Sequence, residues 1–437
     1  MALLYTPKKV EKNHRTFTAK VQGLDYQGLG VAKIEGKTWF IENALPDEKV
    51  QVAVLEEKRQ YGKGVAKKWL ETSTQRVPPA CVYYEKCGGC QTQHIPLEMQ
   101  RQIKEQALFQ RLSKLQGEPI ALMPRIVGEQ WHYRRRLRLS LYWDKKHGLR
   151  IGFRQKNSQN IEPVQSCLVI EKPLDNLLPK ITALLQHWSN PKNLGHLELV
   201  RADNGVALLL RHQKNLAEKD RTLLIEFAQK EHLMLFVQDD EQIQQLYGES
   251  PYYELNKGQR LHFDVRDFIQ INPQLNQVMI DTALNWLDLT DQDQVLDLFC
   301  GMGNFTLPIS AQAKQVVGVE GVAEMVHKAT QNAERNGCKN VQFYQADLAQ
   351  SFSAQQWASL QFNKILLDPP RAGAAFAIPF LAELKAEKIV YVSCNPATLV
   401  RDAEMLLQAG YQVKQVAMID MFPNTGHLES ISLFERK

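Results

Sequence analysis

The C-terminal part of the chain shows the clearest pattern of hydrophobic and polar positions. From about residue 260, short apolar runs alternate with stretches of helical or loop character, and these runs are VLDLF, VVGVE, VQFYQ, KILLDPP and KIVYVSC. Such alternation predicts a doubly wound α/β sheet of the Rossmann type. Two further runs, VKQVAMID and HLESISLFER, follow without a helix between them. We therefore expect an antiparallel pair of strands to close a mostly parallel sheet in a domain spanning residues 256–437.

The N-terminal part has a different pattern, in which short alternating stretches are separated by glycines. Residues 16–21, 38–41 and 50–55 alternate in polarity, and the turn Leu45-Pro46-Asp47 separates the last two stretches. Short strands with frequent turn signals are typical of small antiparallel barrels. The pattern predicts an OB-like β-barrel over residues 10–68.

Residues 69–255 mix strand and helix signals and predict a central α+β domain. One stretch within it alternates with period two: His132, Arg134, Arg136, Arg138 and Ser140 fall on one face, and Tyr133, Arg135, Leu137, Leu139 and Leu141 on the other. In a strand, this places a mainly cationic face opposite a mainly apolar one. A row of guanidinium groups suits contacts with the phosphates of a nucleic acid.

The charge distribution supports a polyanionic partner more strongly than the net charge of +5 does. Residues 1–68 carry thirteen Lys/Arg against eight Asp/Glu, and residues 131–154 carry eight against one, which is Asp144. Basic charge gathered in two places is the footprint expected of a protein that binds nucleic acid.

Composition and length predict an ordinary globular protein of two to four domains. The chain has 437 residues, of which 44% are hydrophobic and 23% charged. It contains no run of about 18 apolar residues, and the stretch before the first lysines is too short for a signal peptide. We expect a cytoplasmic protein without membrane association.

A glycine loop and a series of acids indicate a ligand site in the C-terminal domain. The loop Cys300-Gly301-Met302-Gly303-Asn304 follows the first strand, but it lacks the third glycine of a dinucleotide-binding fingerprint. Glu320 ends the second strand, Asp347 follows the third and Asp368 ends the fourth. The carboxyl ends of parallel strands are where such sheets bind ligands. Glu320 is placed to accept the hydroxyls of a ribose, and Asp347 could accept from an adenine amino group.

A reaction site is predicted where two neighbouring strands end, at Asp368-Pro369-Pro370-Arg371 and Ser393-Cys394-Asn395-Pro396. Pro396 favours the first turn of a helix. Cys394 would then lie beside a helix N-terminus, whose partial positive charge is expected to stabilise the thiolate.

A thiolate beside a methyl donor suits methylation of carbon 5 of a pyrimidine. Addition of Cys394 to carbon 6 makes carbon 5 nucleophilic, and a base must later remove the proton from carbon 5. Glu429, at the start of the terminal strand, is the preferred base, and His427 is the second candidate.

Four cysteines of the central region form a candidate metal site. Cys81, Cys87 and Cys90 are spaced C-x5-C-x2-C around Gly88 and Gly89, and Cys167 lies further along. Four thiolates could hold zinc or a [4Fe-4S] cluster. Three clustered cysteines with one distant cysteine favour iron and sulfur, because zinc sites more often show two C-x2-C pairs.

The motifs FIQINPQLN, DLFCGMGNF, LLDPPRAG, VSCNPATLVRD and GHLESISLFER resemble those of the RNA uracil-C5 methyltransferase family. The resemblance implies a class I methyltransferase domain that uses S-adenosylmethionine, with Cys394 as nucleophile and Glu429 as proton acceptor. It also implies that Cys300 and Cys338 are structural. The implied cofactor contacts are Gln270, Phe299, Asn304, Glu320, Asp347 and Asp368.

The N-terminal half is similar to the ribosomal branch of this family. The run DYQGLGVAKIEGKTWFIENALPDEKV resembles a TRAM domain, although Asp47 stands where that domain usually has glycine. In the ribosomal branch, the cysteines corresponding to Cys81, Cys87, Cys90 and Cys167 ligate a [4Fe-4S] cluster. The resemblance implies 23S ribosomal RNA as the partner of a monomeric enzyme.

Other functions remain open at this stage. An amino methyltransferase acting on adenine or cytosine would use a loop similar to DPPR and would not need Cys394. Methylation of a different ribosomal or transfer RNA uracil is a second alternative. A non-catalytic iron-sulfur RNA-binding protein is a third, against which Glu320, Asp347, Cys394 and Glu429 argue.

Overall fold

The structure is a computed structural model that describes residues 15–239, 242–348, 350 and 355–437. The chain divides into two compact units. The smaller contains the described residues up to Ala80 together with Cys90–Ala107 and Asn424–Gly426. The larger contains Cys81–Gly89, the described residues of Leu108–Pro423, and His427–Lys437. Within the described ranges, no helix is long and apolar enough to cross a membrane.

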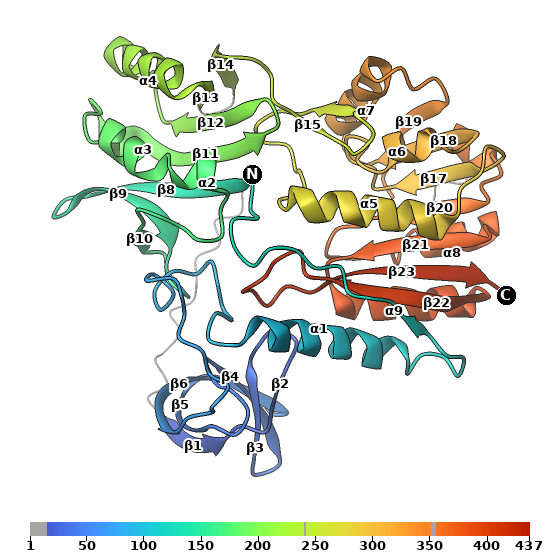
Figure 1. Ribbon diagram of the computed structural model, residues 1–437, viewed down its shortest axis with the longest axis horizontal. Helices are drawn as coiled ribbons and strands as arrows, with labels where there is room; N and C mark the ends of the chain where they lie inside the picture. Colours follow the sequence, from blue (N-terminus) through green and yellow to red (C-terminus); the bar gives the residue numbers. More distant parts are fainter. Residues whose placement is uncertain (1–14, 240–241, 349, 351–354) are drawn as a thin grey trace. The chain divides into compact units, whose positions relative to one another are not determined.

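The smaller unit contains a six-stranded sheet that curls around its own core (Figure 1). Its strands, in the order in which they pair, are β1 (Thr16–Lys20), β5 (Lys49–Glu57), β6 (Tyr61–Glu71), β4 (Lys37–Glu42), β3 (Gly30–Ile34) and β2 (Gly23–Leu24). The three alternating stretches predicted as strands are β1, β4 and β5. The sheet is mixed rather than purely antiparallel, because β4 and β6 run parallel.

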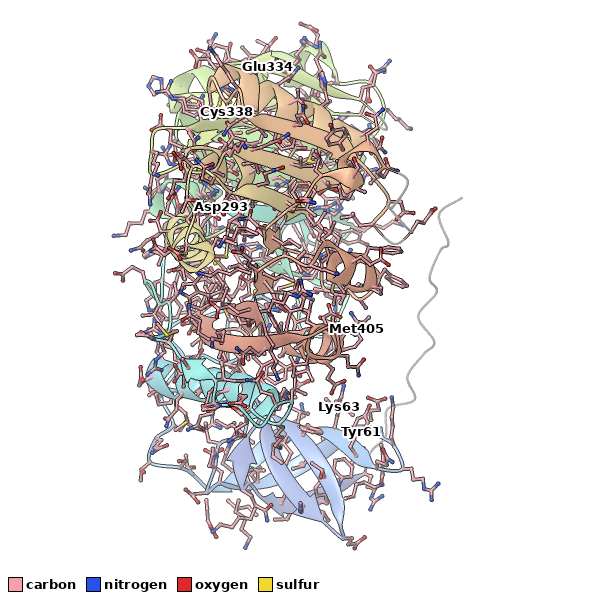
Figure 2. All side chains as sticks on the ribbon, turned by 90° about the vertical axis from the view of Figure 1, so that its right-hand side faces the viewer. Tyr61, Lys63, Asp293, Glu334, Cys338 and Met405 are labelled. Atoms are coloured by element: carbon pink, nitrogen blue, oxygen red, sulfur yellow. The ribbon has the colours of Figure 1, made fainter. Side chains whose placement is uncertain are left out.

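Side chains on β6 alternate between the core and the outside of this sheet. Gly62 lies over the buried ring of Trp39, where an added Cβ would come within 2.5 Å of the indole. Tyr61 and Lys63 take the opposite face and stand on the outer side of β6 (Figure 2). Asp47 has a left-handed backbone with a φ of 68°. This conformation explains why glycine suits the position, since a side chain is disfavoured there.

The larger unit contains a seven-stranded sheet covered on one face by helices. Its strands, in spatial order, are β10 (Ile161–Pro163), β9 (Gly148–Arg154), β8 (Arg136–Asp144), β11 (Leu194–Ala202), β12 (Gly205–His212), β13 (Leu233–Gln238) and β14 (Ile243–Tyr247). Only β12 and β13 pair in parallel. The accompanying helices are α2 (Lys172–Asp175), α3 (Leu178–Leu185) and α4 (Glu218–Glu231). A hairpin of β15 (Tyr252–Glu254) and β16 (Arg260–His262) follows.

The predicted cationic strand is confirmed, but it begins later than expected and its arginines differ in use. Strand β8 starts at Arg136, whereas Arg134 forms only an isolated parallel bridge with Ile170 and His132 adopts a left-handed conformation with a φ of 55°. The Arg136 guanidinium donates to the carbonyls of Val265 and Asp267 and pairs with Glu198 at 2.8 Å. Arg136 is therefore not available to a phosphate, whereas the Arg138 side chain is 55% exposed.

The second sheet of the larger unit has eight strands and matches the predicted doubly wound pattern (Figure 1). In spatial order they are β19 (Val341–Gln345), β18 (Gln315–Glu320), β17 (Gln294–Leu298), β20 (Lys364–Leu367), β21 (Lys388–Ser393), β23 (Glu429–Arg436), β22 (Tyr411–Ile419) and β7 (Ala121–Leu122). The first five are parallel, and β23 runs antiparallel to both β21 and β22, as predicted for the closing pair.

Helices connect the parallel strands, and the order of the strands reverses at β17, which defines the binding edge of such sheets. The helices are α5 (Pro273–Leu287), α6 (Thr306–Ser310), α7 (Ala323–Arg335), α8 (Ile378–Leu384) and α9 (Pro396–Gln408). One further helix, α1 (Leu97–Leu112), precedes β7 along the chain.

Candidate active site

The glycine loop after β17 turns through left-handed backbone conformations. Phe299, Gly301 and Gly303 have φ values of 64°, 55° and 101°. Glycine is favoured at position 303 because its φ of 101° would strain any other residue, and an added Cβ would also displace the end of the Leu307 side chain. The helix that follows, α6, has only five residues. Four amides of the loop are bonded within the protein, to the carbonyls of Val319 and Cys300 and to the carboxylate of Glu320.

The three predicted acids lie at the carboxyl ends of β18, β19 and β20, as expected. Glu320 Oε2 accepts from the amide of Gly301 at 3.2 Å, which ties the second strand to the glycine loop. Asp347 is exposed and accepts from the side chain of Gln350 at 2.8 Å. Asp368 follows β20, and burial raises the pKa of its carboxyl to about 7. Glu320 and Asp368 thus converge on the glycine loop from either side of β17.

A further acid of the site, Asp297, was missed in the sequence. It is fully buried in β17, and its Oδ2 accepts from the Thr306 hydroxyl at 2.5 Å. Its Oδ1 is buried and has no hydrogen-bond partner among the described residues. Burial raises the pKa of Asp297 to about 8, and the charges of Asp368 and Glu320 act in the same direction. The signal was present as a single acid inside the apolar run VLDLF.

The predicted cofactor residues Gln270 and Asn304 are joined by a buried polar network. The amides of Asn304 and Asn276 bond to each other at 3.0 Å, and Asn304 also accepts from the Tyr253 hydroxyl at 3.1 Å. Arg135 lies 4.7 Å above the Tyr253 ring and donates from Nε to the carbonyl of Gln270 at 2.8 Å. Arg135 is only 2% exposed, in agreement with its predicted place on the mainly apolar face.

Cys394 and Glu429 are brought together by the pairing of β21 with β23. Ser393 lies opposite Ser430 in this antiparallel pair, so the next residues outward are Cys394 on one chain segment and Glu429 on the other. Glu429 is buried, and Cys394 is half-buried. The predicted nucleophile and the preferred base therefore stand side by side.

Helix α9 begins at Pro396, as predicted, with Asn395 as its N-cap. The expected lowering of the thiol pKa does not follow. Burial raises the pKa of Cys394, and the charges of Glu429 and Asp368 raise it further. The cation of Arg371 acts in the opposite direction but does not outweigh them. The prediction considered the helix and neither the burial of the thiol, which raises its pKa most, nor the two carboxylates on neighbouring strands.

His427, the second candidate base, is exposed and bonds to Arg371. Its Nδ1 accepts from the Arg371 guanidinium at 2.9 Å, and its ring packs against Phe422 at 5.3 Å between centroids. Glu429 lies in the strand register with Cys394, whereas His427 precedes that strand. This geometry favours Glu429 as the base.

The remaining cysteines have distinct surroundings. Cys300 is buried in the glycine loop, and burial raises its pKa well above the usual range. Cys338 lies just after α7 and packs against the main core (Figure 2). Burial raises the pKa of Cys167 to about 11, and the charges of Cys81 and Cys87 add to this effect. These last three thiols therefore lie close enough to influence one another.

Comparison with known proteins assigns the chain to a family. The model of the tRNA (Uracil-5-)-methyltransferase family matches residues 97–437, and the TRAM domain model matches residues 11–67. Because the first match covers most of the chain, the protein belongs to the tRNA (Uracil-5-)-methyltransferase family. It has the fold of an S-adenosylmethionine-dependent methyltransferase with an N-terminal TRAM domain.

Several curated relatives are similar over their full length. The 23S rRNA (uracil(1939)-C(5))-methyltransferase RlmD of Histophilus somni (strain 129Pt) is 66% identical over 437 residues, with 100% of both chains covered. The protein of the same name from Pasteurella multocida (strain Pm70) is 64% identical over 438 residues, again with 100% of both covered.

A solved structure shares the fold. The tRNA (uracil-54, C5)-methyltransferase of Pyrococcus abyssi, in complex with S-adenosyl-L-homocysteine, aligns with a TM-score of 0.73 at 21% identity. The alignment covers 96% of this chain and 100% of that one.

Proposed function

We propose that this protein transfers a methyl group from S-adenosylmethionine to carbon 5 of uracil 1939 in 23S ribosomal RNA, giving 5-methyluridine. The observation that carries the proposal is the strand register that sets Cys394 beside Glu429, next to an acid-lined glycine loop. The choice of uracil rests on the full-length relatives, whose names state that target.

Cys394 opens the reaction by adding its sulfur to carbon 6 of the uracil. The new S–C6 bond moves the ring electrons to carbon 5 and the carbonyl at carbon 4, which makes carbon 5 a nucleophile. S-adenosylmethionine supplies an electrophilic methyl group, which carbon 5 attacks while the neutral thioether leaves. A thiol with a raised pKa must first lose its proton, so the step should accelerate as the pH rises.

Glu429 completes the reaction by accepting the proton from carbon 5. The C5–H electrons then restore the C5–C6 double bond, and the S–C6 bond breaks to release the Cys394 thiolate. The position of Glu429 next to Cys394 suits both events, because carbons 5 and 6 are adjacent in the ring. The net change replaces one ring proton by a methyl group.

The residues that line the proposed cofactor site suit a cationic ligand. Asp297 has a buried oxygen without a partner, and burial holds the pKa of Asp368 at about 7. Both facts describe carboxylates that lack a positive neighbour, and the methyl donor carries positive charge at its sulfonium and amino groups. We assign its contacts to Gln270, Phe299, Asn304, Glu320, Asp347 and Asp368.

The four cysteines suit a [4Fe-4S] cluster. All four candidate ligands are thiols, and the Gly89 amide donates to Cys87 Sγ at 3.4 Å, as amides commonly do to cluster thiolates. Gly88 approaches the Arg154 carbonyl so closely that an added Cβ would lie 3.1 Å from it. We propose Cys81, Cys87, Cys90 and Cys167 as the ligands of a structural cluster, which would cross-link these segments.

Anaerobic reconstitution with iron and sulfide tests this site. We expect about four irons and four sulfides per chain and a sharp loss of both in Cys87→Ser. Stable binding of one zinc ion to the four thiols, with no uptake of sulfide, would contradict the assignment.

We place RNA contacts on the open half of one face of the seven-stranded sheet. On this face Val200 and Leu209 pack into the main core, and the half beyond them carries cations. Burial lowers the pKa of His196, and the positive charges of Arg138, Arg211 and Arg154 lower it further, so the three guanidinium groups lie near this ring. Phosphates are the complementary partners of such a surface.

A 23S transcript that carries 5-fluorouracil at position 1939 tests the whole proposal. Fluorine cannot leave as a proton, so the covalent adduct should accumulate and mass spectrometry should locate it on Cys394. A matched transcript with 5-fluorouracil only at a different uridine should give no adduct. Methyl transfer to an adenine or cytosine would contradict the proposal. A failure of the wild-type protein to form the adduct would also contradict it.

A further inference from the structure

Helix α9 follows the nucleophile along the chain. It also bonds to the loop that follows β20. Asp402, fully buried in this helix, accepts from the amide of Ala374 at 2.6 Å and from the Tyr391 hydroxyl at 2.7 Å. Its other oxygen accepts from Arg401 Nε at 2.8 Å. One carboxylate therefore ties the loop to both α9 and β21.

Three further contacts from the same helix end fix the preceding residues of the loop. Arg401 Nη2 donates to the Ala372 carbonyl at 2.7 Å. Asn395 and Thr398 both donate to the Arg371 carbonyl, at 3.0 Å and 3.3 Å. The backbone from Arg371 to Ala374 is thus bonded to the helix at three of its four residues.

Gly373 shows how closely the loop approaches the helix. Its φ is 78°, and an added Cβ would lie 2.5 Å from both Arg401 Nη2 and Asp402 Oδ2. Met405, one turn along α9 from Asp402, marks this helix in Figure 2. The close approach puts the loop backbone within reach of the directional bonds from Arg401 and Asp402.

The held loop carries the charged groups that surround the reaction site. It begins at Asp368 and contains Arg371, whose cation opposes the effect of Glu429 and Asp368 on Cys394. Arg371 is exposed, and its guanidinium donates to His427 at 2.9 Å. A long exposed side chain stays near one atom only if its backbone is fixed, because free rotamers would spread its charge.

We propose that Asp402 is a positioning residue of the methyl-transfer reaction, which holds Arg371 beside Cys394 by fixing the loop from Arg371 to Ala374. This inference rests on the proposed role of Cys394 as the nucleophile. Asp402 itself touches neither substrate, so it acts through the loop alone.

The test compares Asp402→Asn with a matched control, Asp220→Asn. Asp220 is also a buried helical carboxylate, 1% exposed, that accepts from a backbone amide and a hydroxyl, both of Ser189, at 3.1 Å and 2.9 Å. Both variants should lose similar stability. Only Asp402→Asn should slow adduct formation with the 5-fluorouracil transcript, by about 100-fold, because small misplacements near reacting atoms have effects of that size.

A second readout follows the thiol without RNA. Alkylation of Cys394 by iodoacetamide, measured on its peptide by mass spectrometry, should reach its midpoint about one pH unit higher in Asp402→Asn than in wild type, because the cation has moved away. Asp220→Asn should keep the wild-type midpoint. Arg401→Gln changes a side chain that is 46% exposed and should raise the alkylation midpoint by a smaller amount. This variant decides the question if Asp402→Asn does not fold.

The inference is overturned if Asp402→Asn, or Arg401→Gln in its place, reacts with the transcript and with iodoacetamide as Asp220→Asn does. A wild-type protein that forms no adduct would instead contradict the proposed function. In that case the alkylation midpoint still tests whether α9 positions Arg371.

Discussion

The loops after β17 and β21 are alike in composition but differ in what they can do. Each follows a buried strand and carries a cysteine, Cys300 in the first and Cys394 in the second. Burial raises the pKa of both thiols, and nearby carboxylates raise it further. Cys300 is 5% exposed and points into the sheet, where an added Cβ at Gly318 would lie 3.0 Å from its sulfur. Cys394 is half-buried and has Arg371 nearby.

If Cys394 is the nucleophile and Cys300 is structural, as proposed, acidic surroundings do not distinguish the two roles. Exposure of the thiol and a nearby cation then distinguish them. Under the proposed function, the first loop, with its glycines and neighbouring carboxylates, binds the cationic methyl donor. The second loop reacts, and helix α9 fixes its neighbours.

The largest expected effect separates the two cysteines. Cys394→Ala should reduce methyl transfer by about 10⁴-fold or more, because the covalent route is lost entirely. Cys300→Ala should still form the adduct with the 5-fluorouracil transcript. Tritium transfer measures methylation, and a gel shift measures the adduct. Methylation by Cys394→Ala would contradict the distinction between the two cysteines.

The next effect tests the division of work between Cys394 and Glu429. Glu429→Gln should form the adduct and transfer the methyl group but fail to release the product, so turnover should fall by about 10²- to 10⁴-fold. A methylated covalent complex should then accumulate with ordinary uracil RNA. If free 5-methyluridine appears at the wild-type rate, another group is the base.

The acids around the first loop should show their proposed binding role in a pH dependence. Burial raises the pKa of Asp368 to about 7 and that of Asp297 to about 8, so both are mostly protonated in the free protein at pH 6. A cationic ligand favours the ionised forms, and its affinity should therefore rise by about tenfold or more from pH 6 to pH 8.

Calorimetry with S-adenosylmethionine and the Cys394→Ala protein measures this dependence without turnover. Asp368→Asn should flatten it, because one of the two protons no longer has to leave. An affinity that falls with rising pH would contradict the assignment of these acids to the cation.

The smallest effect concerns the backbone of the first loop. Gly301 has a φ of 55° with open space around it, so Gly301→Ala should cost about 1 kcal/mol of unfolding free energy from the left-handed conformation alone. Gly321→Ala, at a position with ordinary backbone angles, is the control and should cost less. Urea denaturation distinguishes the two, and equal costs would mean that the loop relaxes.

Much of the fold and of the site could be predicted because the signals are local. The strands of the eight-stranded sheet appear as contiguous apolar runs, and the acids and Cys394 follow directly after them. The rest depends on distant parts of the chain. The Arg136 guanidinium donates to the carbonyls of Val265 and Asp267, and no local pattern in the sequence predicts that contact.

Electrostatic effects were the hardest to foresee. Burial raises the pKa of Cys394, and Glu429, thirty-five positions away along the chain, raises it further because the strand register places it beside the thiol. Asp297 escaped notice because a lone acid in an apolar run usually indicates the end of a strand.

The segment before the seven-stranded sheet also has a consequence for how the molecule behaves at high concentration. Strand β22 would end the eight-stranded sheet with open amide and carbonyl groups, but residues 116–126 cover it. Gln116 bonds to both backbone groups of Val413, β7 pairs with Gln415 and Val416, and Ile126 bonds to Met418 and Asp420. Uncovered edges recruit strands from other chains. This covering segment therefore protects the protein against edge-to-edge aggregation, and its removal should cost solubility before it costs catalysis.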